Sequence, residues 1–108
     1  MSRLYWPAIA IALLGLQLLS ATSAASDSVE DGRRLARSHC SRCHSIDKVG
    51  PSPLSLAPPF RMLHERYPVE TLQEALAEGL TTGHAQMPEF RFDADQVGNF
   101  IAFLKSLE

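Results

Sequence analysis

Apolar residues recur every three or four positions in several stretches of this 108-residue chain, as they do on the buried face of a helix. The pattern predicts helices over residues 28–39, 60–67, 69–78 and 94–107. The last is the clearest, because Asp93 and Gln96 form a capping box at its start. No stretch shows the alternation of a strand, so the sequence predicts an all-α fold.

The first predicted helix contains a glycine. Ser28 is its expected cap, and Gly32 lies one turn further on. Because a glycine inside a helix destabilises it by about 1 kcal/mol, we expect a second helix to cross closely at Gly32. Residues 46–59, rich in proline, and 81–91 are predicted loops, and Gly79 is expected to end the helix before the second.

An apolar segment precedes these helices. Residues 8–19 are almost entirely apolar, follow one positive charge at Arg3, and lead into small residues that include Ala24 and Ala25. This order is typical of a secretory signal peptide, and the run is shorter than the roughly 20 residues of a membrane-spanning helix. The alternative is a retained membrane anchor. Cleavage divides the chain into a signal peptide, 1–24, and one periplasmic domain, 25–108, with no membrane insertion.

Size and charge narrow the class of protein. The chain has ten basic and twelve acidic residues, and only nine basic residues remain once Arg3 is removed with the signal peptide. No basic stripe is present, so a nucleic-acid partner is not expected. A domain this small has a small core and often depends on a metal or covalent staple.

The strongest chemical signal is the run C-S-R-C-H, which contains Cys40, Cys43 and His44. It is the attachment pattern of a c-type haem. Two thiols one helical turn apart bond to the two vinyl groups, and the following imidazole binds the iron. A redox dithiol or half of a zinc site is the alternative, but neither has its usual context here. A carbonyl near Pro51 is expected to accept a hydrogen bond from His44 Nδ1.

An iron bound by His44 has a second axial position. The candidate ligands are Met62, Met87, His39, His64 and His84. Met87 is favoured, because it lies in a loop more than forty residues after the attachment run and Pro88 stiffens the backbone beside it. A methionine sulfur also raises the reduction potential. His84 is the rival ligand.

Together these residues resemble the small class I cytochromes c of bacteria. The resemblance rests on the glycine-bearing helix, C-x-x-C-H, a Gly-Pro loop, Met87-Pro88 and the aromatic-rich last helix, and it covers essentially the whole predicted domain. It implies that the first and last helices cross at Gly32 against Phe103. Ala36 departs from the family, in which an aromatic is common there. The resemblance also implies one covalent haem c bound by Cys40, Cys43, His44 and Met87, the last two as iron ligands.

The function implied is one-electron transfer by a monomer that docks transiently on redox partner proteins. No pattern indicates catalysis on a substrate, so an electron-transfer protein rather than an enzyme is expected. One alternative is a dedicated electron-transfer subunit of a larger periplasmic dehydrogenase or oxidase. The other is a haem-based gas sensor or enzyme in which Met87 is a labile ligand.

Overall fold

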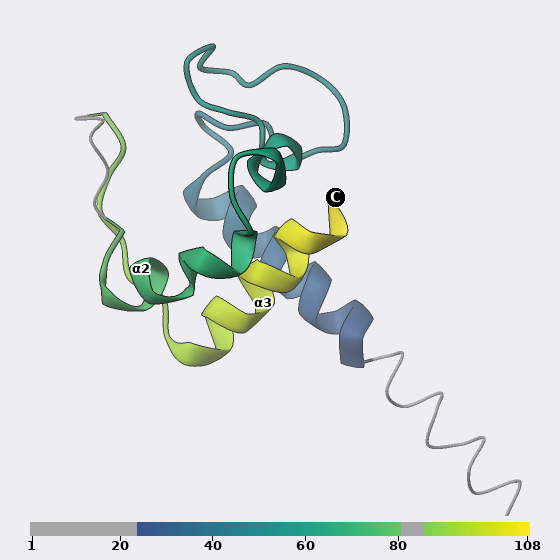
Figure 1. Ribbon diagram of the computed structural model, residues 1–108, viewed down its shortest axis with the longest axis vertical. Coiled ribbons are helices and arrows are strands. Elements are labelled where there is room, and N and C mark those ends of the chain that lie inside the picture. Colours follow the sequence, from purple (N-terminus) through teal and green to yellow (C-terminus); the bar gives the residue numbers. More distant parts are fainter. Residues whose placement is uncertain (1–23, 81–85) are drawn as a thin grey trace, which may run out of the picture.

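A computed structural model describes residues 24–80 and 86–108 of the chain. Every regular element in these residues is helical, which confirms the all-α prediction. A helix over 24–39, here called the N-terminal helix, is followed by two 3₁₀ helices and two α-helices: η1 (Phe60–Glu65), η2 (Val69–Leu72), α2 (Gln73–Glu78) and α3 (Ala94–Ser106). The N-terminal helix crosses α3, and the long loop between the N-terminal helix and η1 extends beyond them (Figure 1).

The first middle helix ends two residues earlier than predicted and is a 3₁₀ helix, whereas the second covers the predicted residues 69–78 but begins as a 3₁₀ helix. Pro59 and Pro68 directly precede η1 and η2. Because a residue before proline avoids the helical region, Pro68 separates η1 from η2. The segment after it becomes α-helical only at Gln73. Gly79 ends α2 with a φ of +120°, so the predicted stop is confirmed.

Ser28 does not cap the N-terminal helix, contrary to the prediction. The residues from Ala24 to Asp27 are already helical. The Ser28 hydroxyl donates to the Ala24 carbonyl at 3.1 Å, which is the bond of a serine inside a helix rather than at its start. A preceding pair of alanines favours helix, so the serine is not the first residue to enter it.

The N-terminal helix and α3 cross at Gly32, as predicted. A Cβ atom added there would lie 2.0 Å from the Asn99 carbonyl oxygen and 2.7 Å from Phe103 Cβ. Phe103 and Ala36 are both completely buried. Arg33 lies beside the crossing, with its guanidinium 5.1 Å from the centre of the Phe103 ring. A small residue at position 36 therefore suits an interface in which the backbones are already close.

The start of α3 is fixed by the predicted capping box. Gln96 N–H donates to Asp93 Oδ1 at 2.8 Å, and Asp93 N–H donates to Gln96 Oε1 at 3.0 Å. Phe92 and Val97 lie on either side of the cap, in the positions of a hydrophobic staple, and both are buried.

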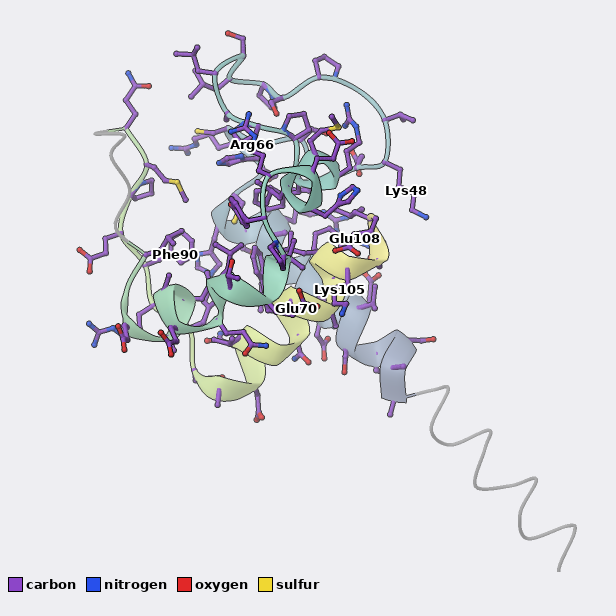
Figure 2. The ribbon with its side chains drawn as sticks, in the orientation of Figure 1. Lys48, Arg66, Glu70, Phe90, Lys105 and Glu108 are labelled. Atoms are coloured by element: carbon purple, nitrogen blue, oxygen red, sulfur yellow. The ribbon has the colours of Figure 1, made fainter. Side chains whose placement is uncertain are left out.

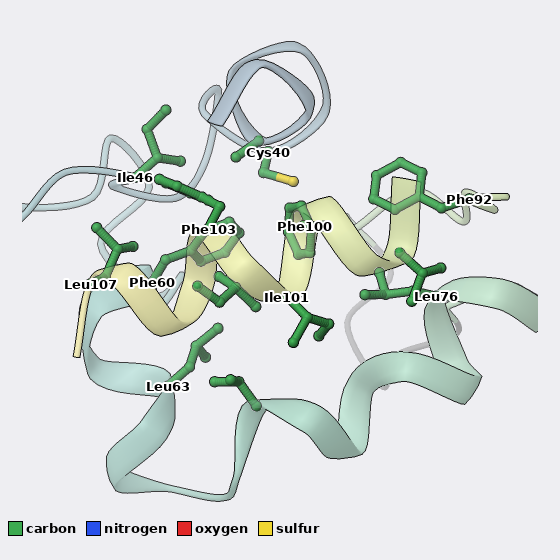
Figure 3. Close-up of a cluster of buried hydrophobic side chains, with 14 residues drawn as sticks. Cys40, Ile46, Phe60, Leu63, Leu76, Phe92, Phe100, Ile101, Phe103 and Leu107 are labelled. Carbon is green, nitrogen blue, oxygen red and sulfur yellow. The ribbon is translucent and has the colours of Figure 1, made fainter. Parts of the chain in front are cut away.

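Helix α3 forms the middle of the core (Figure 3). Its buried residues are Val97, Phe100, Ile101, Phe103 and Leu104. Phe100 meets two other rings: the Phe60 ring lies edge-on to it at 5.9 Å, and the Phe92 ring lies 5.5 Å away. The attachment run and η1 therefore pack on α3 through one continuous set of side chains.

In the described residues, no helix is long and apolar enough to cross a membrane. The predicted signal peptide, apart from Ala24, lies outside those residues, as does His84.

Candidate haem-binding site

The attachment run lies in a turn that continues the N-terminal helix. Cys40 N–H donates to the Ala36 carbonyl at 2.8 Å, and His44 N–H donates to the Cys40 carbonyl at 3.0 Å. This hydrogen bonding keeps nearly helical geometry through the run, so the two thiols are about one turn apart. Cys40 is buried and Cys43 is half-buried.

A cavity of about 1170 Å³ opens beside this turn. Cys40, Cys43, His44 and Met87 all line it, so the structure brings the four predicted haem-binding residues together. Met62 and His64 do not line it, although the sequence left both open as ligands. Of the other candidates, His39 lines the cavity.

His44 is held by a backbone carbonyl on its far side. Its Nδ1 lies 2.8 Å from the Pro58 oxygen, so the expected carbonyl near Pro51 is wrong by seven residues. With Nδ1–H donating to this carbonyl, Nε2 is left as the nitrogen that can bind a metal. The Phe60 ring lies 4.8 Å from the imidazole and limits its rotation. No sequence signal marks Pro58, because any residue type carries a carbonyl.

The loop over residues 46–59 is tied to the attachment turn by hydrogen bonds. Leu54 N–H donates to the Cys43 carbonyl at 3.1 Å, and Phe60 N–H donates to the Ser45 carbonyl at 2.9 Å. Ser45 N–H in turn donates to the Ser52 hydroxyl at 3.0 Å. These bonds hold the loop, and with it the Pro58 carbonyl, in one place beside His44.

The chemistry of the cavity fits a haem better than the alternatives. The cavity is lined in part by apolar side chains, those of Leu54, Leu56 and Ala57. Leu56 is 86% exposed, as expected for an apolar side chain that a bound apolar group would cover. Burial, and after it the charge of Cys43, raises the pKa of the Cys40 thiol to about 12. A thiol with so high a pKa is a poor nucleophile, which disfavours a redox dithiol.

A zinc site is disfavoured as well. No group of three or more His, Cys, Asp or Glu side chains that could hold a metal ion occurs within residues 24–80 and 86–108. Among these residues, the two thiols and the imidazole of the attachment run therefore do not converge as the ligands of a structural zinc site do.

Met87 reaches the cavity from the other loop. It is half-buried between Gln86 and Pro88, which also line the cavity. The strand-like stretch that follows is bound to the α2 region: Leu80 N–H donates to the Phe90 carbonyl at 3.2 Å, and Phe92 N–H donates to the Leu76 carbonyl at 2.8 Å. The backbone just after Met87 is therefore anchored.

A helical fold around a cavity lined by C-x-x-C-H defines the class of c-type cytochromes. A protein-family model described as "Cytochrome C oxidase, cbb3-type, subunit III" matches residues 27–104, and the chain belongs to this family. The match extends from the N-terminal helix through most of α3. Neither a curated protein nor a solved structure matches the chain. The domain is thus a cytochrome c domain whose cofactor is haem c and whose function is haem-based electron transfer.

Proposed function

We propose that this chain is a periplasmic one-electron carrier with a single haem c, bonded to Cys40 and Cys43 and ligated by His44 and Met87. The observation that carries the proposal is that all four side chains line one cavity. When bound, the haem supplies an iron that gains or loses one electron between its ferric and ferrous states. The protein is exported by residues 1–24 and acts as a monomer on redox partner proteins.

The protein's own residues prepare the site for this change. The Pro58 carbonyl accepts the hydrogen bond from Nδ1–H of His44, which orients the imidazole. Phe60 packs on the imidazole of His44 and Leu54 lines the cavity, so both would limit the access of water to this side of a bound haem. Met87 contributes a neutral sulfur, which favours the ferrous state and raises the reduction potential. None of these groups has to move or change protonation during electron transfer.

A second candidate function has a specific observation in its favour. The family description names subunit III of an oxidase. The domain would then pass electrons as a dedicated subunit of a larger periplasmic oxidase or dehydrogenase, with the same haem chemistry. Purification of the chain from its natural host separates the two functions, because a free carrier elutes alone and a subunit elutes with its catalytic partner.

The test of the proposal is an absorption spectrum of protein exported from a host with cytochrome c maturation. We expect covalently bound haem, a low-spin ferric spectrum, and the weak long-wavelength charge-transfer band of methionine-ligated ferric haem. Met87→Ala should lose that band and lower the reduction potential, because an axial ligand is among the strongest determinants of potential. Met62→Ala is the matched control and should keep both. Absence of covalent haem, or a Met87→Ala variant that keeps the band, contradicts the proposal.

The surface beside the attachment run has the opposite charge to the domain as a whole. Residues 25–66 contain seven basic and five acidic residues, whereas residues 67–108 contain two basic and seven acidic ones. Arg37 and Arg42 line the cavity and are exposed. Figure 2 shows Lys48 and Arg66 above Glu70, with Glu108 below Lys48. A partner that approaches the haem edge near the cysteines would therefore meet positive charge and should itself be acidic.

We therefore expect oxidation of the ferrous protein by ferricyanide, an anion, to slow as ionic strength rises. If the negative net charge of the domain governed the reaction, the rate would instead rise with ionic strength. The sign of the salt dependence therefore shows whether the charge near the cavity or the net charge of the domain controls the rate. Arg42→Gln should lower the low-salt rate about two- to threefold. Arg34→Gln removes the same charge from an arginine that pairs with Asp31 and does not line the cavity, so it should have a smaller effect. Stopped-flow kinetics measures these rates, and a rate that increases with salt refutes the expectation.

A further inference from the structure

His39 makes an aromatic contact across the mouth of the cavity. It is the last residue of the N-terminal helix and directly precedes Cys40. Its ring stacks on Phe90, with centroids 6.0 Å apart and an interplanar angle of 27°. It also meets the edge of Phe92 at 5.4 Å, and Phe90 and Phe92 are 5.2 Å apart. The three rings thus form one cluster, here called the His39 cluster.

The His39 cluster lies on the chain close to the predicted iron ligand. Phe90 follows Met87 by three residues, and both line the cavity together with His39 (Figure 2 labels Phe90). The hydrogen bonds that anchor this stretch run to Leu76 and Leu80. Between described residues, no hydrogen bond joins the segment 86–92 to the N-terminal helix. Ring packing on His39 is therefore a direct connection from this segment to the helix that carries the attachment run.

We propose that His39 is a positioning residue for Met87. By packing on Phe90, its ring holds the segment 86–90 against the attachment run, and so keeps the methionine sulfur at the cavity. The inference rests on the proposed role of Met87 as an iron ligand. In the sequence, His39 is only one of five candidate ligands. The geometry assigns it a different task, in which the imidazole acts as an aromatic surface and not through its nitrogens.

The expected size of the effect follows from the kind of contact. Aromatic pairs at these separations change an equilibrium constant by about two- to tenfold beyond the area that they bury. Loss of the His39 ring should therefore increase, by about that factor, the small fraction of protein in which the sulfur has left the iron. His39 is exposed, so this loss should change the fold little.

The experiment compares three substitutions at one position in the haem-loaded protein. His39→Ala removes the ring, His39→Gln keeps polarity without a ring, and His39→Phe keeps a ring without the nitrogens. Carbon monoxide binding to the ferrous protein reports how often the sulfur leaves the iron, and the methionine band of the ferric protein reports its ligation. His64→Ala is the control, because His64 is also exposed but does not line the cavity.

We expect the affinity for carbon monoxide to rise about two- to tenfold in His39→Ala and His39→Gln. The methionine band should be weaker in both variants, and His39→Phe should behave as the unsubstituted protein. Unchanged binding in His39→Ala overturns the inference, and so does rescue by Gln but not by Phe. If the unsubstituted protein has covalent haem but no methionine band, the ligand assignment fails first, which is distinct from failure of His39 alone.

Discussion

The double variant Cys40→Ala/Cys43→Ala, exported from a host with cytochrome c maturation, is expected to lack the cooperative unfolding transition of the haem-loaded protein. The predicted domain has 84 residues, and a chain of this size buries little apolar surface on folding. The site adds a cavity of about 1170 Å³ to this small core. Without a covalently held group, water enters the cavity, and the residues around it lose the contacts that balance chain entropy.

Circular dichroism on heating is the measurement, with unsubstituted protein from the same host as the control. We expect the variant to lose most of its helical signal at 25 °C, because small domains have only about 5–15 kcal/mol of stability and a bound ligand contributes directly to it. A sharp, native-like transition in the variant would show that the helices fold without covalent haem. In that case the core would fold without the cofactor, and haem would bind to a domain that is already folded.

The variant Gly32→Ala is expected to be destabilised by about 3 kcal/mol or more, although alanine is the better helix former. Its Cβ would clash with the Asn99 carbonyl oxygen. The backbone of the N-terminal helix fixes the position of this Cβ, and the oxygen belongs to the backbone of α3. No side-chain rotation relieves it, so the N-terminal helix and α3 must move apart. That movement removes the contact of Phe103, which is completely buried at the crossing.

Gly98→Ala provides the matched control. Gly98 lies in α3 and is exposed, and an added Cβ there meets nothing within 4 Å. We expect this variant to gain up to about 1 kcal/mol from the better helix propensity of alanine. Urea unfolding of the haem-loaded proteins measures both changes. Equal midpoints for the two variants would show that the crossing adjusts without loss, contrary to the geometry of the helix backbones.

The parts of the fold that could be predicted from the sequence have signals carried by side chains. Asp93 and Gln96 predict the start of α3 because their side chains make the capping hydrogen bonds. Gly32 predicts the helix crossing because a glycine destabilises a helix unless a close approach requires it. The structure confirms both predictions, the capping box and the crossing.

The features that could not be predicted depend on the backbone or on tertiary packing. The acceptor for His44 is the carbonyl of Pro58, and the path of a proline-rich loop decides which carbonyl reaches the imidazole. Ser28 has the side chain of a cap but lies inside the N-terminal helix, where the same hydroxyl satisfies a different bond. The contact of His39 with Phe90 joins residues fifty-one positions apart, and no local pattern encodes it.

The rings that meet on α3 have a consequence for how such a site can change during evolution. Phe100 touches Phe60, which packs on His44, and also Phe92, which belongs to the His39 cluster. A change of volume at Phe100 would therefore reach both the His44 side and the His39 side of the cavity at once. Selection could then reshape the cavity from this one interior position while the residues that line it are kept.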